Sequence, residues 1–147
     1  MGKEIKMTIY DALSKQFDYV KNGNGFAEIP SEKILECTEW LKNEAGYDYL
    51  EMITASDHNE KFLLVYTLIN VVDKTDIIIR TSVPREKPEI DSLSNIWTGA
   101  DFQERELFDL MGIVFTGHKN LKRIVLWDGF EGHPQRKDFK DGRHSGA

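Results

Sequence analysis

The chain has 147 residues, of which 40% are hydrophobic and 30% charged, and its formal net charge is −6, a composition typical of one soluble globular domain. Its longest apolar run, Phe62–Val72, is far shorter than the roughly 20 residues that a membrane-spanning helix needs, and no secretory signal is visible at its start. Contact with a membrane is therefore expected only through a partner, and the single cysteine, Cys37, excludes a disulfide within the chain and a four-cysteine iron–sulfur or zinc site.

Two amphipathic helices are predicted in the first third of the chain. The first runs from about Lys6 to Tyr19, ends at the glycine-rich turn Asn22–Gly25, and precedes a short strand at Phe26–Ile29. The second begins with Ser31 as its N-cap and ends near Gly46. Its inner face is predicted to consist of Ile34, Cys37, Thr38 and Leu41. Cys37 is interpreted as a small buried hydrophobic residue, because nearby glutamates disfavour a reactive thiolate.

Three strands follow the helices. They are predicted at Tyr49–Ala55, Lys61–Val72 and Ile77–Val83, and the last two form an antiparallel hairpin around the turn Asp73–Asp76. Helices followed by strands indicate an α+β fold, with helices packed on one face of a small, mainly antiparallel sheet. The sequence contains neither a GxGxxG nor a GxxxxGK[ST] motif, so no dinucleotide or P-loop phosphate site is predicted.

A third helix is predicted to begin at Asp101. Glu104 is expected to reach back to that residue in a capping box, and Gly112 is expected to end the helix. Arg105 and Asp109 are four residues apart, a spacing that favours an ion pair on one helix face. The pattern alone is typical of a solvated amphipathic helix.

A short motif occurs twice after this helix. Phe-Thr-Gly-His, ending at His118, recurs as Phe-Glu-Gly-His, ending at His133. One hypothesis is an independent small metal-dependent enzyme that uses these two histidines with Asp128 or Asp138. The spacing is not that of a helical ligand pair, and no cysteine is nearby, so the metal hypothesis is the weaker one.

The last twenty residues carry little apolar surface. Residues 1–127 are predicted to form the α+β domain and residues 128–147 an extended docking segment, because the latter contains few apolar side chains, namely Phe130, Pro134, Phe139 and Ala147. Their burial cannot offset the roughly 1–2 kcal/mol per residue that ordering a backbone costs. The segment is therefore expected to need another surface. Arg136 is the residue expected to make forked hydrogen bonds to a partner carboxylate.

Charge supports a protein partner for this segment. Residues 1–111 contain 12 Lys and Arg against 21 Asp and Glu, whereas residues 112–147 contain 7 against 4. No aromatic stacking platform accompanies the basic residues, and the sequence pI is near 5.2. Binding of nucleic acid is therefore not expected.

Three ordered motifs resemble the complex I 30-kDa subunit family, whose bacterial members are the C subunits of NADH:quinone oxidoreductase. They are Glu-Arg-Glu-Leu-Phe-Asp-Leu-Met-Gly-Ile-Val-Phe-Thr-Gly-His at residues 104–118, Leu-Lys-Arg-Ile at 121–124 and Gly-Phe-Glu-Gly-His-Pro-Gln-Arg-Lys-Asp-Phe at 129–139. The resemblance extends over roughly residues 48–139. The chain departs from the usual family pattern at Met111, Lys119 and Gln135, and these differences bear on the choice between a quinone reductase and a hydrogenase complex.

The resemblance implies a non-catalytic subunit in the hydrophilic arm of a complex that transfers electrons from NADH or another donor to quinone. It implies that this chain holds no cofactor, and that iron–sulfur clusters, with flavin or a NiFe centre, belong to partner subunits. The expected partners are the large quinone-site subunit and neighbouring iron–sulfur subunits, on the cytoplasmic side of the cell membrane. The alternative is the equivalent subunit of a membrane-bound, energy-converting [NiFe] hydrogenase.

No catalytic or metal-binding residue is assigned on this basis. The residues assigned to partner docking are Glu104, Arg105, Glu106, Asp109, Gly117, His118, Phe130, Gly132, His133, Pro134, Arg136, Lys137, Asp138 and Phe139.

Overall fold

The computed structural model describes residues 8–119, 121 and 132–138. In chain order its elements are α1 (Ile9–Gln16), β1 (Lys21–Asn22), β2 (Ala27–Glu28), the 3₁₀ turn η1 (Ser31–Lys33), α2 (Ile34–Asn43), β3 (Tyr49–Asp57), β4 (Lys61–Asn70), β5 (Thr75–Pro84), β6 (Glu89–Asp91), α3 (Gly99–Met111) and β7 (Val114–Thr116). None of the described helices is long and apolar enough to cross a bilayer. The predicted domain boundary at residues 127 and 128 lies outside the described residues.

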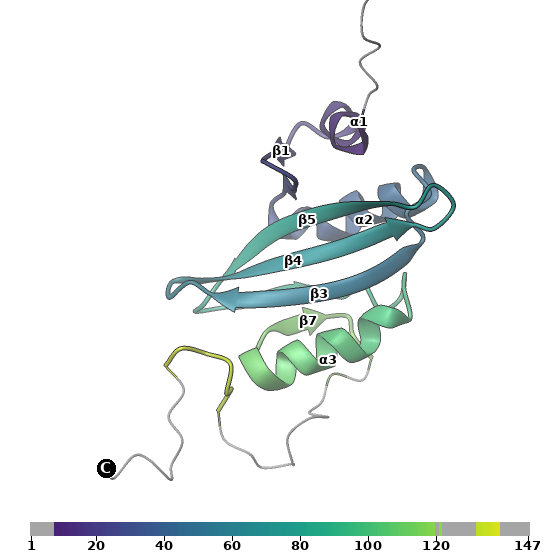
Figure 1. Cartoon of the computed structure of the whole chain (residues 1–147). Helices are drawn as coiled ribbons and strands as arrows, with labels where there is room; N and C mark the ends of the chain where they lie inside the picture. Colours follow the sequence, from purple (N-terminus) through teal and green to yellow (C-terminus); the bar gives the residue numbers. More distant parts are fainter. Residues whose placement is uncertain (1–7, 120, 122–131, 139–147) are drawn as a thin grey trace, which may run out of the picture.

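The central feature is a five-stranded sheet in the order β1-β2-β5-β4-β3. All neighbouring strands are antiparallel except β2 and β5, which are parallel. A separate pair, β6 and β7, is parallel. Figure 1 shows α2 behind the large sheet and α3 with β7 beside its outer strand β3. The predicted α+β class, with a mainly antiparallel sheet, is confirmed.

One face of the sheet forms the core. In β4 the side chains of Phe62, Leu64 and Tyr66 have no exposed surface, whereas the alternating residues Leu63 and Val65 are half-buried. This period of two follows from the alternation of side chains across a strand. The helices α2 and α3 contribute to the same apolar cluster through Ile34, Cys37, Leu41, Ala100 and Leu107. The predicted inner face of α2 and the β4–β5 hairpin are therefore confirmed, but the turn of the hairpin spans residues 71–74 instead of Asp73–Asp76, which were predicted.

The first helix is shorter than predicted. It ends at Gln16 instead of near Tyr19, because Phe17 adopts an extended conformation with φ −129° and ψ 124°. Thr8 begins the helix with a capping box, in which its hydroxyl accepts from the Asp11 N–H and the Asp11 carboxylate accepts from the Thr8 N–H. Aspartate fills the position that glutamate usually takes in this motif.

The predicted N-cap of the second helix is wrong. Ser31 opens the 3₁₀ turn η1, and Lys33 stands at the N-cap position of α2 without a side-chain cap. Pro30 is extended, with φ −64° and ψ 146°, and its carbonyl accepts from Lys33 N–H at 3.0 Å. This tight turn displaces the N-cap of the α-helix by two residues, from Ser31 to Lys33. Gly46, with φ +80°, follows the helix as expected.

Candidate functional site

Helix α3 organises most of the residues that were assigned to docking. The structure places Glu104, Asp109 and His118 against or within this helix, and it brings residues 132–138 to the helix C-terminus. The tail segment that was expected to need a partner therefore lies, in its described part, on the chain's own surface. Phe130 and Phe139 lie outside the described residues.

Glu104 is fully buried and holds a neighbouring loop. Its carboxylate accepts from the Ser92 hydroxyl at 2.6 Å and from the Leu93 N–H at 2.7 Å. The predicted capping box with Asp101 is therefore wrong, since α3 begins at Gly99 and the carboxylate points to a loop twelve residues away. Burial raises the pKa of Glu104 to about 7, although the two hydrogen bonds oppose this shift. Helix α3, which was predicted to be solvated, thus buries the acidic side chains Glu104 and Asp109.

His118 fastens the segment after β7 to the start of α3. Its Nε2 lies 2.9 Å from the Asp101 Oδ1, and the histidine side chain is only 2% exposed. Gly117, immediately before it, has φ +84°, a conformation that glycine adopts without strain. The first Gly-His motif therefore makes a contact within the chain, between the segment after β7 and the start of α3.

The second Gly-His motif contacts the opposite end of α3. His133 Nδ1 donates to the Asp109 carbonyl at 3.0 Å, and Arg136 Nε donates to the Met111 carbonyl at 2.6 Å. The Gln135 N–H donates to the Leu110 carbonyl at 3.0 Å. These donors satisfy carbonyl groups that a helix C-terminus leaves without intrahelical partners. Residues 132–138 therefore act as a C-terminal cap supplied from a distant part of the chain.

The two histidines do not form a joint site. Their contact points on α3 are eight residues apart, about 12 Å along a helix axis. Within the described ranges, no group of three or more His, Cys, Asp or Glu side chains is arranged to hold a metal ion. Cys37 is buried in the core, which raises the pKa of its thiol to about 12. The geometry gives no support to the hypothesis of a small enzyme built on His118 and His133.

Asp57, at the end of β3, contacts residues 132–138 through a hydrogen bond and through the ion pairs of Arg85. Its carboxylate accepts from the backbone N–H groups of Asn59 and Lys137 at 2.9 and 2.8 Å, and it forms an ion pair with Arg85. Burial opposes ionisation, but these hydrogen bonds and the guanidinium lower the pKa of Asp57 to about 2. Arg85 also reaches Asp138 at 3.3 Å.

An aromatic ring supports the same cluster. The guanidinium groups of Arg85 and Arg136 lie 5.1 and 5.0 Å from the centroid of the buried Phe62 ring. Cation–π contacts of this kind contribute roughly 0.5–2 kcal/mol. Arg136, which was expected to bind a partner carboxylate, thus has contacts within its own chain.

The remaining docking candidates are at least partly accessible. Arg105, Glu106 and Pro134 are half-buried, and the other members of the set are exposed, namely Gly117, Gly132, Lys137 and Asp138. Sequence reasoning missed four residues that prove structurally central, Asp57, Arg85, Ser92 and Gln103. No local motif marks the contacts that make them central, because the partners in those contacts lie 12 to 80 residues away along the chain.

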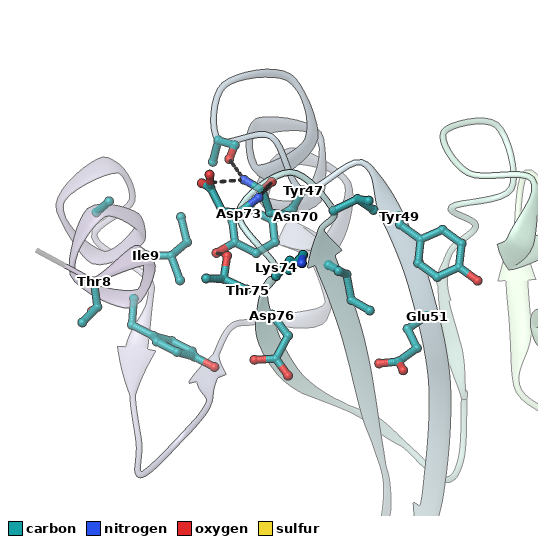
Figure 2. Close-up of a pocket in the computed structure, with 15 residues that line it drawn as sticks. Thr8, Ile9, Tyr47, Tyr49, Glu51, Asn70, Asp73, Lys74, Thr75 and Asp76 are labelled. Carbon is teal, nitrogen blue, oxygen red and sulfur yellow. Dashed lines mark hydrogen bonds between the residues drawn. The ribbon is translucent and has the colours of Figure 1, made fainter.

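A groove of about 1500 Å³ lies between α1 and the ends of β3, β4 and β5. Figure 2 shows Glu51 near the exposed Tyr49, and Asp76 farther toward α1. Its turn is held by Asn70, whose side chain donates to Asp73 and accepts from the Asp73 N–H. Acidic, apolar and neutral polar side chains line this groove together with Lys74.

We expect Glu104→Gln to remove a pH dependence of stability. The folded chain retains a proton at Glu104 up to about pH 7, whereas the unfolded chain loses it near pH 4.5. The free energy of unfolding should therefore fall as pH rises between these values, by about 1.4 kcal/mol per unit at most. Urea unfolding at pH 5 and pH 7.5 measures the effect, with Glu106→Gln on the same helix as control. Parallel pH profiles for the wild type and Glu104→Gln would contradict it.

We expect Gly112→Ala to loosen residues 132–138. Gly112 has φ +77°, and an added Cβ would lie 2.7 Å from Arg136 and 2.8 Å from His133. Gly117→Ala is the matched control, because Gly117 has φ +84° and no atom within 4 Å of the new Cβ. Both variants should lose roughly 1–2 kcal/mol to backbone strain. Only Gly112→Ala should also accelerate hydrogen exchange at the Lys137 amide, and equal exchange in the two variants would refute the argument.

Comparisons with known proteins agree with this architecture. Residues 27–145 match the family described as "Respiratory-chain NADH dehydrogenase, 30 Kd subunit". The chain is 41% identical over 114 residues to the C subunit of NADH-quinone oxidoreductase from Moorella thermoacetica, a match that covers 76% of this chain and 77% of that protein. It is 40% identical over 116 residues to the combined C/D subunit of NADH-quinone oxidoreductase from Phocaeicola vulgatus, a match that covers 78% of this chain but 22% of that longer protein.

The fold is also found in a solved respiratory complex. A chain of the membrane-bound sulfane sulfur reductase, an archaeal respiratory membrane complex, superimposes with a TM-score of 0.78 at 26% identity, covering 92% of this chain and 85% of that chain. The family match includes strands β2 to β5 of the large sheet, α3 and both Gly-His motifs. This chain belongs to the family of the 30-kDa subunit of respiratory-chain NADH dehydrogenase.

Proposed function

We propose that this chain is a non-catalytic docking subunit in the hydrophilic arm of an NADH:quinone oxidoreductase, packed against the large quinone-site subunit. The observation that carries the proposal is the family match over residues 27–145. The fold fits this role, since the chemically versatile side chains Glu104, His118 and His133 are engaged in contacts that hold the chain together.

The Phocaeicola relative supports the choice of partner. The region similar to this chain accounts for 22% of a protein whose name combines the C and D subunits, so a related sequence is there joined covalently to a second subunit. Covalent fusion keeps two folded units at high effective concentration, which suits units that work in contact. We infer that the present chain contacts the equivalent large subunit without a covalent link.

The cofactors are assigned to the partners. Iron–sulfur clusters and flavin require cysteine ligands or a nucleotide motif, and this sequence supplies one buried cysteine and no such motif. We further propose that the chain lies peripherally on the cytoplasmic side of the membrane, where the complex holds it. An equivalent place in an energy-converting [NiFe] hydrogenase is the second candidate. The likeness to a chain of the membrane-bound sulfane sulfur reductase supports a place in a respiratory membrane complex other than NADH:quinone oxidoreductase.

Affinity purification from gently solubilised membranes tests this assignment. A tagged copy of the chain should recover the large subunit and iron–sulfur subunits in equal amounts, while the isolated chain should absorb only near 280 nm. NADH-oxidising subunits with flavin among the recovered proteins would support the quinone reductase, and nickel would support the hydrogenase. Recovery of the chain alone, or stoichiometric iron, nickel or flavin in the isolated chain, would refute the docking function.

We expect Arg136→Ala to lower the amount of assembled complex in membranes. The substitution removes the hydrogen bond to the Met111 carbonyl and the contact with the Phe62 ring, so residues 132–138 lose an anchor. The loss should be about 1–3 kcal/mol in the stability of this surface. Lys87→Ala is the control, since that side chain is 77% exposed and lies outside the set of docking residues.

Blue-native gels give the yield, and quinone-reductase assays give the activity of each assembled copy. Arg136→Ala should reduce yield with near-normal activity per copy. Full assembly accompanied by a collapse of turnover would instead place this residue on the reaction path.

A further inference from the structure

Strand β3 forms the outer edge of the large sheet, next to α3 (Figure 1). Along an antiparallel strand, the backbone groups of successive residues point alternately toward and away from the paired neighbour. The His58 N–H donates to the Lys61 carbonyl, which fixes this alternation at the hairpin end. The N–H and C=O groups of Ile53, Ala55 and Asp57 therefore point outward, away from β4.

The first of these outward-pointing groups, the Ile53 N–H, is already hydrogen-bonded to a side chain of α3. The Ile53 N–H donates to the Gln103 side-chain oxygen at 2.6 Å, and the Gln103 amide nitrogen donates to the Glu51 carbonyl at 3.4 Å. One residue of an added parallel strand would make the same pair of bonds. It would donate its N–H to the Glu51 carbonyl and accept from the Ile53 N–H. A side-chain amide of α3 thus occupies the position of a peptide group.

Past Gln103, no residue of the described ranges pairs with the backbone of this edge. Among the residues that the structure describes, none accepts a hydrogen bond from the backbone N–H of Ala55 or Asp57. Natural edge strands are commonly protected by lysine, proline or a bulge. The stretch Ile53–Asp57 contains neither lysine nor proline, and the bulge in β3 lies earlier, between Leu50 and Met52.

A groove of about 380 Å³ runs along this edge. The buried Leu107 lines it, Met52 is 48% exposed beside it, and Gln135 from the tail borders it. Glu106 is the charged residue among those that line the groove. The site therefore offers backbone hydrogen-bond partners in a row, an apolar contact and one negative charge.

We propose that an extended segment of a partner subunit adds to the β3 edge along Ile53–Asp57 and places a basic side chain near Glu106. Only a polypeptide backbone supplies alternating donors and acceptors at the spacing of a strand, which is how β-augmentation achieves its affinity. This inference rests on the docking function proposed above and names the surface and chemistry of the contact.

The contacts between residues 132–138 and Asp57 make this edge suitable for binding. Lys137 N–H and Arg85 hold the Asp57 carboxylate, and Asp57 ends the strand, so the edge is fixed at its far end. Gln103 fixes it at the near end. A strand held straight in advance loses less conformational entropy when a partner binds.

Hydrogen exchange resolved to the Ala55 amide tests the proposal. The amide should exchange rapidly in the isolated chain and at least tenfold more slowly in the assembled complex. Slow exchange in a proven monomer would show that the chain covers its own edge, and would overturn the proposal. Protection that grows with the concentration of the isolated chain would assign the edge to a second copy, with the same consequence.

A matched pair of variants supplies the second measurement. Ala55→Pro deletes the outward N–H and leaves the bonds to β4 intact, a position where an edge strand tolerates proline. Ala55→Val adds comparable bulk and keeps the N–H. Loss of one hydrogen bond should reduce the affinity for the remaining complex about two- to tenfold in Ala55→Pro relative to Ala55→Val.

Circular dichroism and thermal melting must first show that both variants fold. If Ala55→Pro does not fold, the exchange measurement on the wild type decides alone. Equal affinity of two folded variants, or an Ala55 amide that exchanges at the same rate before and after assembly, would refute the strand addition. In that case the chain would still co-purify with its complex, whereas failure of the docking function would abolish co-purification.

Discussion

The buried Glu104 carboxylate connects the parts of this molecule that the sheet alone does not hold. Its bonds to Ser92 and Leu93 tie the middle of α3 to the loop that follows β6. Removing a charged or acidic group from water is costly unless its hydrogen bonds are satisfied, so the loop and the helix must keep this geometry together. With α3 fixed in the middle, His118 can hold its start and His133 and Arg136 its end.

The strands could be predicted from sequence because they depend on local pattern. The two strands of the β4–β5 hairpin are rich in β-branched and aromatic residues and are separated by a short turn, and the predicted start at Lys61 agrees with the structure. The role of Glu104 could not be predicted in the same way. A glutamate three residues after Asp101 satisfies the local pattern of a capping box. In the structure, however, the Glu104 carboxylate accepts hydrogen bonds from the loop after β6 instead.

The ion-pair cluster at Asp57 illustrates the same limit more strongly. Lys137 is eighty residues from Asp57, and Arg85 is twenty-eight residues from it. Charged residues are frequent in this chain, so composition gives no reason to connect these three. Only the antiparallel hairpin, which brings Pro84 beside Lys61, places Arg85 near the end of β3. The polar anchors of residues 132–138 could therefore not be foreseen from the sequence.

The anchoring of the tail changes how it can serve assembly. Ordering seven residues, 132–138, costs on the order of 10 kcal/mol in backbone entropy. The bonds of Lys137 to Asp57, Gln135 to Leu110 and Arg136 to Met111 offset part of that cost before any partner arrives. A partner then meets a surface that is already formed, and more of the contact energy appears as affinity. For a docking subunit of the kind proposed here, such a preorganised surface is the property on which selection can act.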